Sequence, residues 1–317
     1  RAGNLALVAN RADNSISVLS IQSKQVKLID TVTIGEQVAH VAFTPDGKRA
    51  LAAKFPGHKV ALLEVDGQKV TYTKRDLAVG LWPYNLDITP DGKLALTADN
   101  GNAGGSDGNV DTVSVIDMEA NPPRVIDKVV VGEAPEGIAI SPTGRLAVAI
   151  LLRGSNNAKT DWFYNRNGSV AVLRIDGKKV TKVGEVEVRG LPEGAVFSPD
   201  GNWLYIGNFM DSDISVLRVS GDSVTNTGAL LNLPGMSGLE LHDALLQAGV
   251  QLPLVFITGH GDVPMAVERM KKGAVDFLEK PFNDAQLCAV VRQCLQRASD
   301  AHAAGEAERS AATRLER

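Results

Sequence analysis

Residues 44–48, Thr44-Pro45-Asp46-Gly47-Lys48, form a short phrase that returns three more times in the first two-thirds of the chain. The later copies are Thr89-Pro90-Asp91-Gly92-Lys93, Ser141-Pro142-Thr143-Gly144-Arg145 and Ser198-Pro199-Asp200-Gly201-Asn202. Successive prolines are 45, 52 and 57 residues apart. A period of this length is typical of repeat architectures, so the sequence predicts one structural unit that recurs along the chain.

Each copy lies inside the same longer pattern of apolar segments. A strand-like alternation such as Val41-Ala42-Phe43 precedes the phrase, and a run of small apolar residues such as Ala50-Leu51-Ala52-Ala53 follows it. A third run, for example Val60-Ala61-Leu62-Leu63, leads to a fourth through a turn such as Asp66-Gly67. Asp-Gly closes hairpins because glycine accepts a positive φ. Four short antiparallel strands per unit predict the blade of a β-propeller.

Residues 5–34 fit the same unit but lack its first strand. Leu5–Asn10 matches the second strand, Ile16–Leu19 the third and Val26–Ile29 the fourth. The sequence therefore predicts a mainly β protein, with a propeller of about five visible blades over residues 1–233. We expect residues 229–233 to supply the strand that the first blade lacks and so to close the ring.

The phrases Leu7-Val8-Ala9-Asn10 and Tyr205-Ile206-Gly207-Asn208, together with the Pro-Asp-Gly turns, resemble the bacterial YVTN-type propellers. That group borders on the lactonase family of propellers, and the resemblance covers about residues 3–230. It implies either of two functions. Related propeller lactonases use an axial calcium ion to polarise a lactone carbonyl, whereas many YVTN-type propellers are non-catalytic recognition scaffolds.

From Pro234 onward the apolar spacing becomes helical, which predicts a second unit over residues 234–317. Three separated motifs, Pro234–Leu241, Leu254–Asp262 and Gly273–Phe282, resemble the receiver domain of bacterial response regulators. The resemblance implies the C-terminal part of a flavodoxin-like α/β fold.

Particular residues of this second unit match receiver positions. Thr258 matches the switch threonine, Phe277 the rotating aromatic residue and Lys280 the phosphate-contacting lysine, which Pro281 would follow through a cis peptide. The position of the phosphate-accepting aspartate, however, is Leu230, and leucine cannot accept a phosphoryl group. We interpret the segment as a receiver remnant.

Composition narrows the function further. The net charge of −4 gives no electrostatic reason to expect a nucleic-acid partner, and no apolar stretch is long enough to cross a bilayer. The sequence contains no Gly-x-Ser-x-Gly elbow, phosphate-binding loop or zinc-ligand spacing. The resemblance to these propellers implies a small-molecule lactone partner, and it favours a periplasmic or secreted location for the propeller.

Equivalent positions of the repeat predict where a site would lie. The first strand of each propeller blade lines an axial channel, and its loops gather equivalent residues into a ring. Polar residues occupy the start of these strands and the ends of the second strands, and their side chains are the hard oxygen donors that calcium selects. The candidate calcium ligands are Asn10, Asn85, Asp99, Glu136, Glu193 and Asn208.

The resemblance gives these groups roles in lactone opening. Glu136 and Glu193 would act with the calcium ion, and His40 would be the general base because its ordinary pKa lies near neutrality. Two alternatives stay open. The polar groups could instead hydrogen-bond strand ends, or the acidic loop from Asp99 to Asp111 could hold the metal.

Substrate-binding candidates are aromatic. Tyr84 occupies the channel mouth, at the position of Glu136 and Glu193 in its own blade. The insertion at residues 153–168 carries Trp162, Phe163 and Tyr164, which could wall a pocket for an acyl chain or cap one end of the barrel. The sequence favours a metal-assisted lactone hydrolase, with the acyl-homoserine lactones of bacterial signalling as possible substrates. The alternative is a non-catalytic secreted or periplasmic binding module.

Overall fold

The computed structural model describes residues 4–22, 25–232, 242–243, 246–247, 254–258, 270–279, 286, 289–290, 292–294 and 296–297. The chain divides into two compact units, Arg1–Leu233 and Pro234–Arg317, at the point where the sequence pattern changes.

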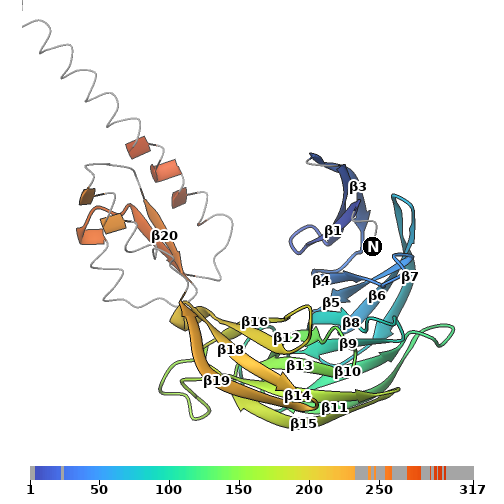
Figure 1. Ribbon diagram of the computed structural model, residues 1–317. Coiled ribbons are helices and arrows are strands. Elements are labelled where there is room, and N and C mark those ends of the chain that lie inside the picture. Colours follow the sequence, from blue (N-terminus) through green and yellow to red (C-terminus); the bar gives the residue numbers. More distant parts are fainter. Residues whose placement is uncertain are drawn as a thin grey trace, which may run out of the picture. The chain divides into compact units, whose positions relative to one another are not determined.

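The first unit consists of five antiparallel sheets in chain order (Figure 1). Blade 1 has three strands, β1 (Leu5–Asn10), β2 (Ser15–Gln22) and β3 (Gln25–Thr33). Blade 2 contains β4 (Val38–Phe43), β5 (Arg49–Lys54), β6 (Lys59–Asp66) and β7 (Lys69–Ala78). Blade 3 contains β8 (Pro83–Ile88), β9 (Leu94–Asp99), β10 (Asp111–Asp117) and β11 (Arg124–Gly132). Blade 4 contains β12 (Pro135–Ile140), β13 (Leu146–Leu151), β14 (Ser169–Asp176) and β15 (Lys179–Glu187). Blade 5 contains β16 (Pro192–Phe197), β17 (Trp203–Asn208), the short 3-10 helix η1 (Phe209–Asp211), β18 (Asp213–Ser220) and β19 (Ser223–Asn232). The predicted four complete blades and one blade of three strands are confirmed.

The structure of the repeated turn shows why the same residue types recur in it. The Thr44 hydroxyl donates to Asp46 Oδ1 (2.6 Å) and accepts the backbone N–H of Arg49 (3.1 Å), so the two side chains fix the link between inner and second strand. Gly47 has a φ of 69°, which favours glycine. The proline of one turn also packs toward the glycine of the next blade, since a Cβ on Gly144 would lie 3.3 Å from Pro90 Cδ.

The hydrophobic core lies between the blades. One cluster joins blades 3 and 4 and includes the fully buried side chains of Leu96, Leu151 and Leu173. Three further clusters join blade 4 to blade 5, blade 2 to blade 3 and blade 1 to blade 2. Both faces of blades 2, 3 and 4 are thereby covered, which explains why their second and third strands read as nearly continuous apolar runs rather than as alternation.

The predicted closure of the ring by residues 229–233 is wrong. Residues 229–232 belong to β19, where Leu230 pairs with Ser215 of β18, and among the described strands β1 pairs with β2 alone. β1 and β19 lie at opposite ends of the series of blades (Figure 1). A hairpin between neighbouring strands closes a short loop and therefore costs less conformational entropy than pairing across the whole unit.

The second unit contains a parallel strand pair, β20 (Val255–Thr258) and β21 (Asp276–Glu279), with Val255 opposite Asp276. Parallel pairing agrees with the α/β expectation for this segment. Thr258 and Phe277 belong to these strands, whereas Lys280 and Pro281 lie outside the described residues. Within the described parts of both units, no helix combines the length and apolar character that a membrane span requires.

The interblade core predicts a large cost for truncating a buried leucine. Leu96→Ala removes a side chain that is 0% exposed between blades 3 and 4, and should lower the free energy of unfolding by about 2–5 kcal/mol. Leu81→Ala is the matched control, because Leu81 is 57% exposed, and should change it by less than about 0.5 kcal/mol. Urea denaturation measures both. Equal losses in the two variants would contradict the assignment of the core.

Candidate active site

Three consecutive blades begin their inner strand with the same strained backbone turn. The residues before Pro83, Pro135 and Pro192 have φ near +50°, although none of them is glycine; they are Trp82 (53°), Ala134 (48°) and Leu191 (50°). Left-handed backbone is unfavourable for residues that carry a Cβ, and persists where the surroundings enforce it.

Hydrogen bonds from the end of the second strand hold each of these turns. Asn100 donates its backbone N–H to the Trp82 carbonyl (3.0 Å), Leu152 to Ala134 (3.2 Å) and Phe209 to Leu191 (3.0 Å). The second residue after each strained position is the second residue of its inner strand, and we call this end of the inner strands the mouth. The residues at this position are Tyr84, Glu136 and Glu193, so three equivalent backbone turns lead into them.

Glu136 and Glu193 lie close enough to influence each other electrostatically. Burial and the negative charge of Glu193 raise the pKa of Glu136 to about 7, while the positive charge of Arg11 acts in the opposite direction. Glu136 is half-buried and Glu193 is exposed. A carboxyl group with this pKa exchanges its proton near neutral pH, which suits it to general acid–base chemistry.

Arg11 is a site residue that the sequence analysis missed. Its guanidinium carbon lies 4.2 Å from the centroid of the Phe55 ring, and its Nη1 donates to the Tyr84 hydroxyl (3.4 Å). Counting back from the repeated proline could not find Arg11, because blade 1 has no inner strand. The sequence feature that could have identified Arg11 is its position directly after the second strand of blade 1. Phe55 has the equivalent position in blade 2.

The polar residues at the ends of the second strands serve their own blades. Asn10 Nδ2 donates to Ser15 Oγ (3.1 Å) and Ser17 Oγ (2.8 Å). Asn208 Nδ2 donates in the same way to Asp213 Oδ1 (2.7 Å) and Ser215 Oγ (2.9 Å). These contacts agree with the alternative to a calcium site, in which the polar side chains at the strand ends form hydrogen bonds within their own blades.

Asp99 occupies the equivalent position in blade 3. It accepts hydrogen bonds from the hydroxyls of Thr97 (2.6 Å), Thr112 (3.0 Å) and Ser114 (2.6 Å). Its side chain is almost completely buried, and burial raises its pKa to about 6 in spite of these donors.

The structure therefore does not gather the six predicted calcium donors into one site. Three of them, Asn10, Asp99 and Asn208, form hydrogen bonds within three different blades. Glu136 and Glu193 lie at the mouth, where the charge of Arg11 acts on Glu136. In the part of the chain that the structure describes, no three or more histidine, cysteine, aspartate or glutamate side chains form a group able to hold a metal ion. This holds also for the loop from Asp99 to Asp111, where burial raises the pKa of Asp111 to about 6.

An axial cavity of about 420 Å³ lies among the inner strands of blades 2 to 5. It is lined by His40, Ala42, Asn85, Leu86, Asp87, Ile138, Ala139, Ile140, Pro142, Ala195, Val196 and Phe197. Burial lowers the pKa of His40, with Asp87 opposing this effect, so the imidazole is neutral at pH 7. His40 thus belongs to the cavity wall, one residue further along its strand than the mouth positions.

The aromatic insertion lies in the loops between second and third strands. Trp162 is 83% exposed and packs edge to face with Phe163 (5.3 Å between ring centroids), while both approach Gly108 of the blade 3 loop. None of the contacts described for Trp162, Phe163 or Tyr164 joins them to the carboxylates at the axis.

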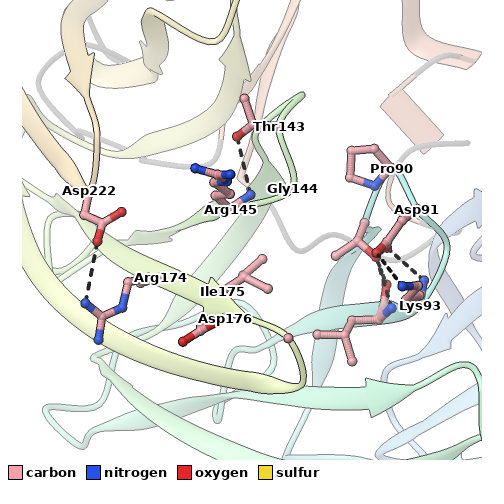
Figure 2. Close-up of a pocket in the computed structure, with 13 residues that line it drawn as sticks. Pro90, Asp91, Lys93, Thr143, Gly144, Arg145, Arg174, Ile175, Asp176 and Asp222 are labelled. Carbon is pink, nitrogen blue, oxygen red and sulfur yellow. Dashed lines mark hydrogen bonds and ion pairs between the residues drawn. The ribbon is translucent and has the colours of Figure 1, made fainter.

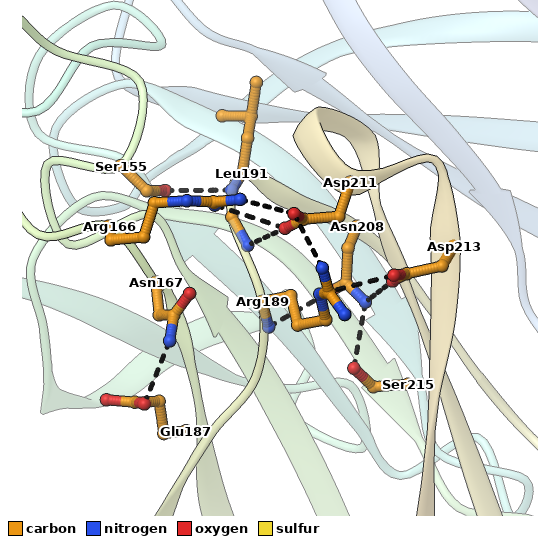
Figure 3. Close-up of polar contacts among 11 residues, drawn as sticks. Ser155, Arg166, Asn167, Glu187, Arg189, Leu191, Asn208, Asp211, Asp213 and Ser215 are labelled. Atoms are coloured by element: carbon orange, nitrogen blue, oxygen red, sulfur yellow. Dashed lines mark hydrogen bonds and ion pairs between the residues drawn. The ribbon is translucent and has the colours of Figure 1, made fainter. Parts of the chain in front are cut away.

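A polar network ties this insertion to blade 5 (Figure 3). Asp211 pairs with Arg166 and with Arg189 (2.9 Å) and accepts the backbone N–H of Gly190 (2.8 Å). Burial alone would raise the pKa of Asp211, but the hydrogen bonds from Arg189 and Arg166 hold it well below its ordinary value. The network fixes the residues that lead into β16, the strand that carries Glu193.

A second hollow of about 510 Å³ lies at the other end of the inner strands, among the repeated turns (Figure 2). Thr143 stands there at the position that aspartate takes in the other three turns. The lining contains the cations Lys93, Arg145 and Arg174 and the acids Asp91, Asp176 and Asp222. Arg174 pairs with Asp222 (3.6 Å), and the balance of charges gives this hollow no preference for an anion or a cation.

The charge coupling at the mouth predicts the direction of two pKa changes. Glu193→Gln should lower the pKa of Glu136 by removing a negative neighbour, and Arg11→Leu should raise it by removing a positive one. Carbon-13 NMR titration of the glutamate carboxyl groups measures both. A Glu136 midpoint that moves in neither variant would show that the three groups are not coupled.

The same carboxyl predicts how stability depends on pH. Glu136 keeps its proton to about pH 7 in the folded chain but loses it near its ordinary pKa of about 4.3 when unfolded, so its contribution to stability is present at low pH and lost as pH rises between these values. Asp99 and Asp111 titrate in the same direction, so only the difference between variants isolates Glu136. Glu136→Gln should flatten part of the decline in unfolding free energy between about pH 4.3 and 7. An unchanged slope would contradict this.

Comparisons with known proteins divide the chain in the same place. Residues 231–292 match the family model of the response regulator receiver domain. The transcriptional regulatory protein FixJ of Azorhizobium caulinodans is 47% identical over 92 residues, which are 29% of this chain and 41% of FixJ. The chain therefore spans well under half the length of this relative, and Leu230, the residue at the acceptor position, is part of propeller strand β19.

Solved structures match most of the chain at low identity. A chain of hydrazine synthase from Kuenenia stuttgartiensis superposes with a TM-score of 0.58 at 19% identity, covering 74% of this chain and 64% of that one. The periplasmic gluconolactonase PpgL of Pseudomonas aeruginosa has a TM-score of 0.55 at 18% identity, covering 73% of this chain and 68% of that one. These likenesses show the fold. The chain joins a β-propeller of the architecture found in lactonases to a segment of a response regulator receiver domain.

Proposed function

We propose that the propeller unit hydrolyses lactones at the mouth of its axial channel, with Glu136 as the general base. The observation that carries this proposal is a half-buried carboxyl at the mouth, whose pKa burial and the charge of Glu193 raise to about 7 while the charge of Arg11 opposes them. The gluconolactonase among the similar structures supports the choice of lactones, as analogy of fold alone.

The reaction uses residues already at the mouth. Ionised Glu136 removes a proton from water as the water oxygen attacks the lactone carbonyl carbon. Arg11 donates a hydrogen bond to the carbonyl oxygen as negative charge develops there. Its guanidinium is positioned by the contact with the Phe55 ring and by the hydrogen bond to the Tyr84 hydroxyl. The ring C–O bond then breaks, and the protonated Glu136 returns its proton to the departing oxygen. The product is the hydroxy acid.

The sequence predicted a calcium ion as the metal and His40 as the general base, and these are the alternatives to the mechanism with Glu136. Glu136 and Glu193 could supply two carboxylates to a cation, but Asn10, Asp99 and Asn208 hydrogen-bond within their own blades, so the mechanism uses no metal. His40 is neutral and could accept a proton, although Asp87 rather than Glu136 is the charge that acts on it. Gluconolactone and N-acyl-homoserine lactones are the two substrate classes to compare.

A non-catalytic binding module is the second candidate. Its support is the exposure of Trp162 (83%), Phe209 (64%) and Val110 (69%) in the loops between second and third strands, since exposed apolar side chains that gather on one surface mark interaction sites. Purified protein that opens neither class of lactone, with or without added calcium, would favour this function.

The assignment of Glu136 predicts both a rate loss and a pH profile. Glu136→Gln should lower kcat/KM by about 100-fold or more, as expected for loss of a general base. In the wild type, kcat/KM should rise with pH through about 7 as Glu136 ionises, and Glu193→Gln should shift this rise to lower pH.

Continuous titration of released acid measures these rates. Glu64→Gln is the matched control, because Glu64 is exposed and pairs with Arg49 beside the repeated turn of blade 2, at the other end of the sheet from the mouth. Full activity in folded Glu136→Gln together with a large loss in His40→Gln would transfer the role of base to His40. Loss of turnover on chelation, restored by calcium, would establish the metal route.

A further inference from the structure

One edge of β1 differs from the corresponding edge in every other blade. The second strands of blades 2 to 5 each pair with an inner strand on one side and with a third strand on the other. β1 matches these second strands, yet among the described strands it pairs with β2 alone. The edge of β1 opposite β2, called here the free edge, therefore presents backbone groups to which a further strand could bond.

The hydrogen bonds between β1 and β2 identify these backbone groups. The Ile21 N–H donates to the Asn4 carbonyl (2.8 Å), and bonded pairs alternate along an antiparallel ladder. Residues of β1 at an even distance from Asn4 therefore direct their backbone groups toward β2. The N–H and C=O groups of Leu5, Leu7 and Ala9 lie at odd distances and face the free edge.

Apolar side chains beside the free edge are more exposed than their counterparts elsewhere. Leu7 and Val41 are half-buried members of the cluster between blades 1 and 2. The residues at the same positions of β5 and β8 are Leu51, which is 0% exposed, and Leu86, which is 1% exposed. Those two pack in one cluster with Ala42 of the inner strand β4. An inner strand on β1 would cover Leu7 and Val41 in the same way.

We propose that the free edge of β1 accepts an extended segment of a partner polypeptide, which becomes the inner strand of blade 1. This inference does not depend on the proposed function. The segment runs antiparallel to β1, as β4 runs to β5, and its backbone bonds Leu7 and Ala9. Strand addition of this kind takes its affinity from main-chain hydrogen bonds and its specificity from side-chain contacts.

The side chain of the partner strand that faces Val41 must be short. The inner-strand residues at this register are Ala42 in blade 2, Asp87 in blade 3 and Ala139 in blade 4. Ala42 and Ala139 pack in the clusters shared with the next blade. The neighbouring residue Ile140 packs in the cluster shared with the preceding blade, so this position of a strand added to β1 would face away from blade 2. The structure thus predicts a strand with a short residue opposite Leu7.

A synthetic peptide with the inner-strand sequence of blade 4, residues 133–144, tests the inference on the full-length protein. Its Ala139 would lie opposite Leu7, as it lies opposite Val148 in blade 4. At saturation, hydrogen exchange of the Leu7 and Ala9 amides should slow by about ten-fold or more, because a bonded amide exchanges only when its bond opens. The amides that bond β2 should change much less. Fluorescence anisotropy of labelled peptide measures the affinity.

Two peptide variants form a matched pair. Ala139→Phe places a ring against Leu7 and Val41 and should weaken binding by about ten-fold or more, since overpacking of a confined site is unfavourable. Ile140→Phe introduces the same ring on the opposite face and should bind as the parent peptide does. In the protein, Ala9→Pro removes an N–H from the free edge without removing a bond to β2, and should also weaken binding of the parent peptide.

Three outcomes would overturn the inference. Slow exchange of Leu7 and Ala9 in the protein alone would show that this chain or a second copy already bonds the free edge. Protection by the peptide that is confined to the outer strand β3 would place the peptide on the other edge of blade 1. Equal affinities of the parent and Ala139→Phe peptides would show that no packing against Leu7 and Val41 takes place.

Discussion

The burial of apolar sheet faces between neighbouring blades is the interaction on which the propeller unit depends. No blade contains a core of its own, since each cluster of buried side chains combines residues from two adjacent sheets. The inner strands, and with them the residues at the mouth, take their positions from this packing. Hydrogen bonds such as that from Ile140 to Asp87 then fix the registers between blades.

The same backbone strain recurs at the entry to the inner strands of blades 3, 4 and 5. Trp82, Ala134 and Leu191 adopt left-handed conformations that interior strand residues avoid, and each is held by a bond from the second strand of its own blade. Strain of this kind persists only where surrounding contacts over-determine the backbone. Its repetition at three equivalent positions shows that one structural solution orients three different side chains, a tyrosine and two glutamates.

The sequence predicted the strands well because local pattern decides them. Apolar alternation, small-residue runs and Asp-Gly turns fix both the type and the order of the elements, and the five sheets follow that pattern. Closure was predicted wrongly because the apolar pattern of residues 229–232 fits pairing with either β1 or β18. No local sequence signal shows which of the two pairings is more stable. In the structure this segment is part of β19 and pairs with β18, the third strand of blade 5.

Prediction of the site was partial for a related reason. Register along the repeat predicted that Glu136 and Glu193 occupy equivalent positions, and each is the second residue of its inner strand, because that position depends only on the distance from a repeated turn. It could not tell whether a polar side chain faces the axis or its own blade. Asn10, Asp99 and Asn208 have serine and threonine hydroxyls within reach on the adjacent strand, and those contacts depend on cross-strand geometry. Arg11 was missed because it belongs to the blade that lacks the counted strand.

The packing of each repeated proline toward the next blade's glycine gives the interfaces between blades a common chemistry. Pro45 approaches Gly92, Pro90 approaches Gly144 and Pro142 approaches Gly201. Because each contact involves only nearest neighbours, as in other repeat proteins, a blade added or removed as a whole leaves the remaining joints intact. The propeller is thus modular, and the chain can pass from propeller to another fold where an outer strand ends. The match to the receiver family model begins at residue 231, and β19 ends at the next residue, Asn232.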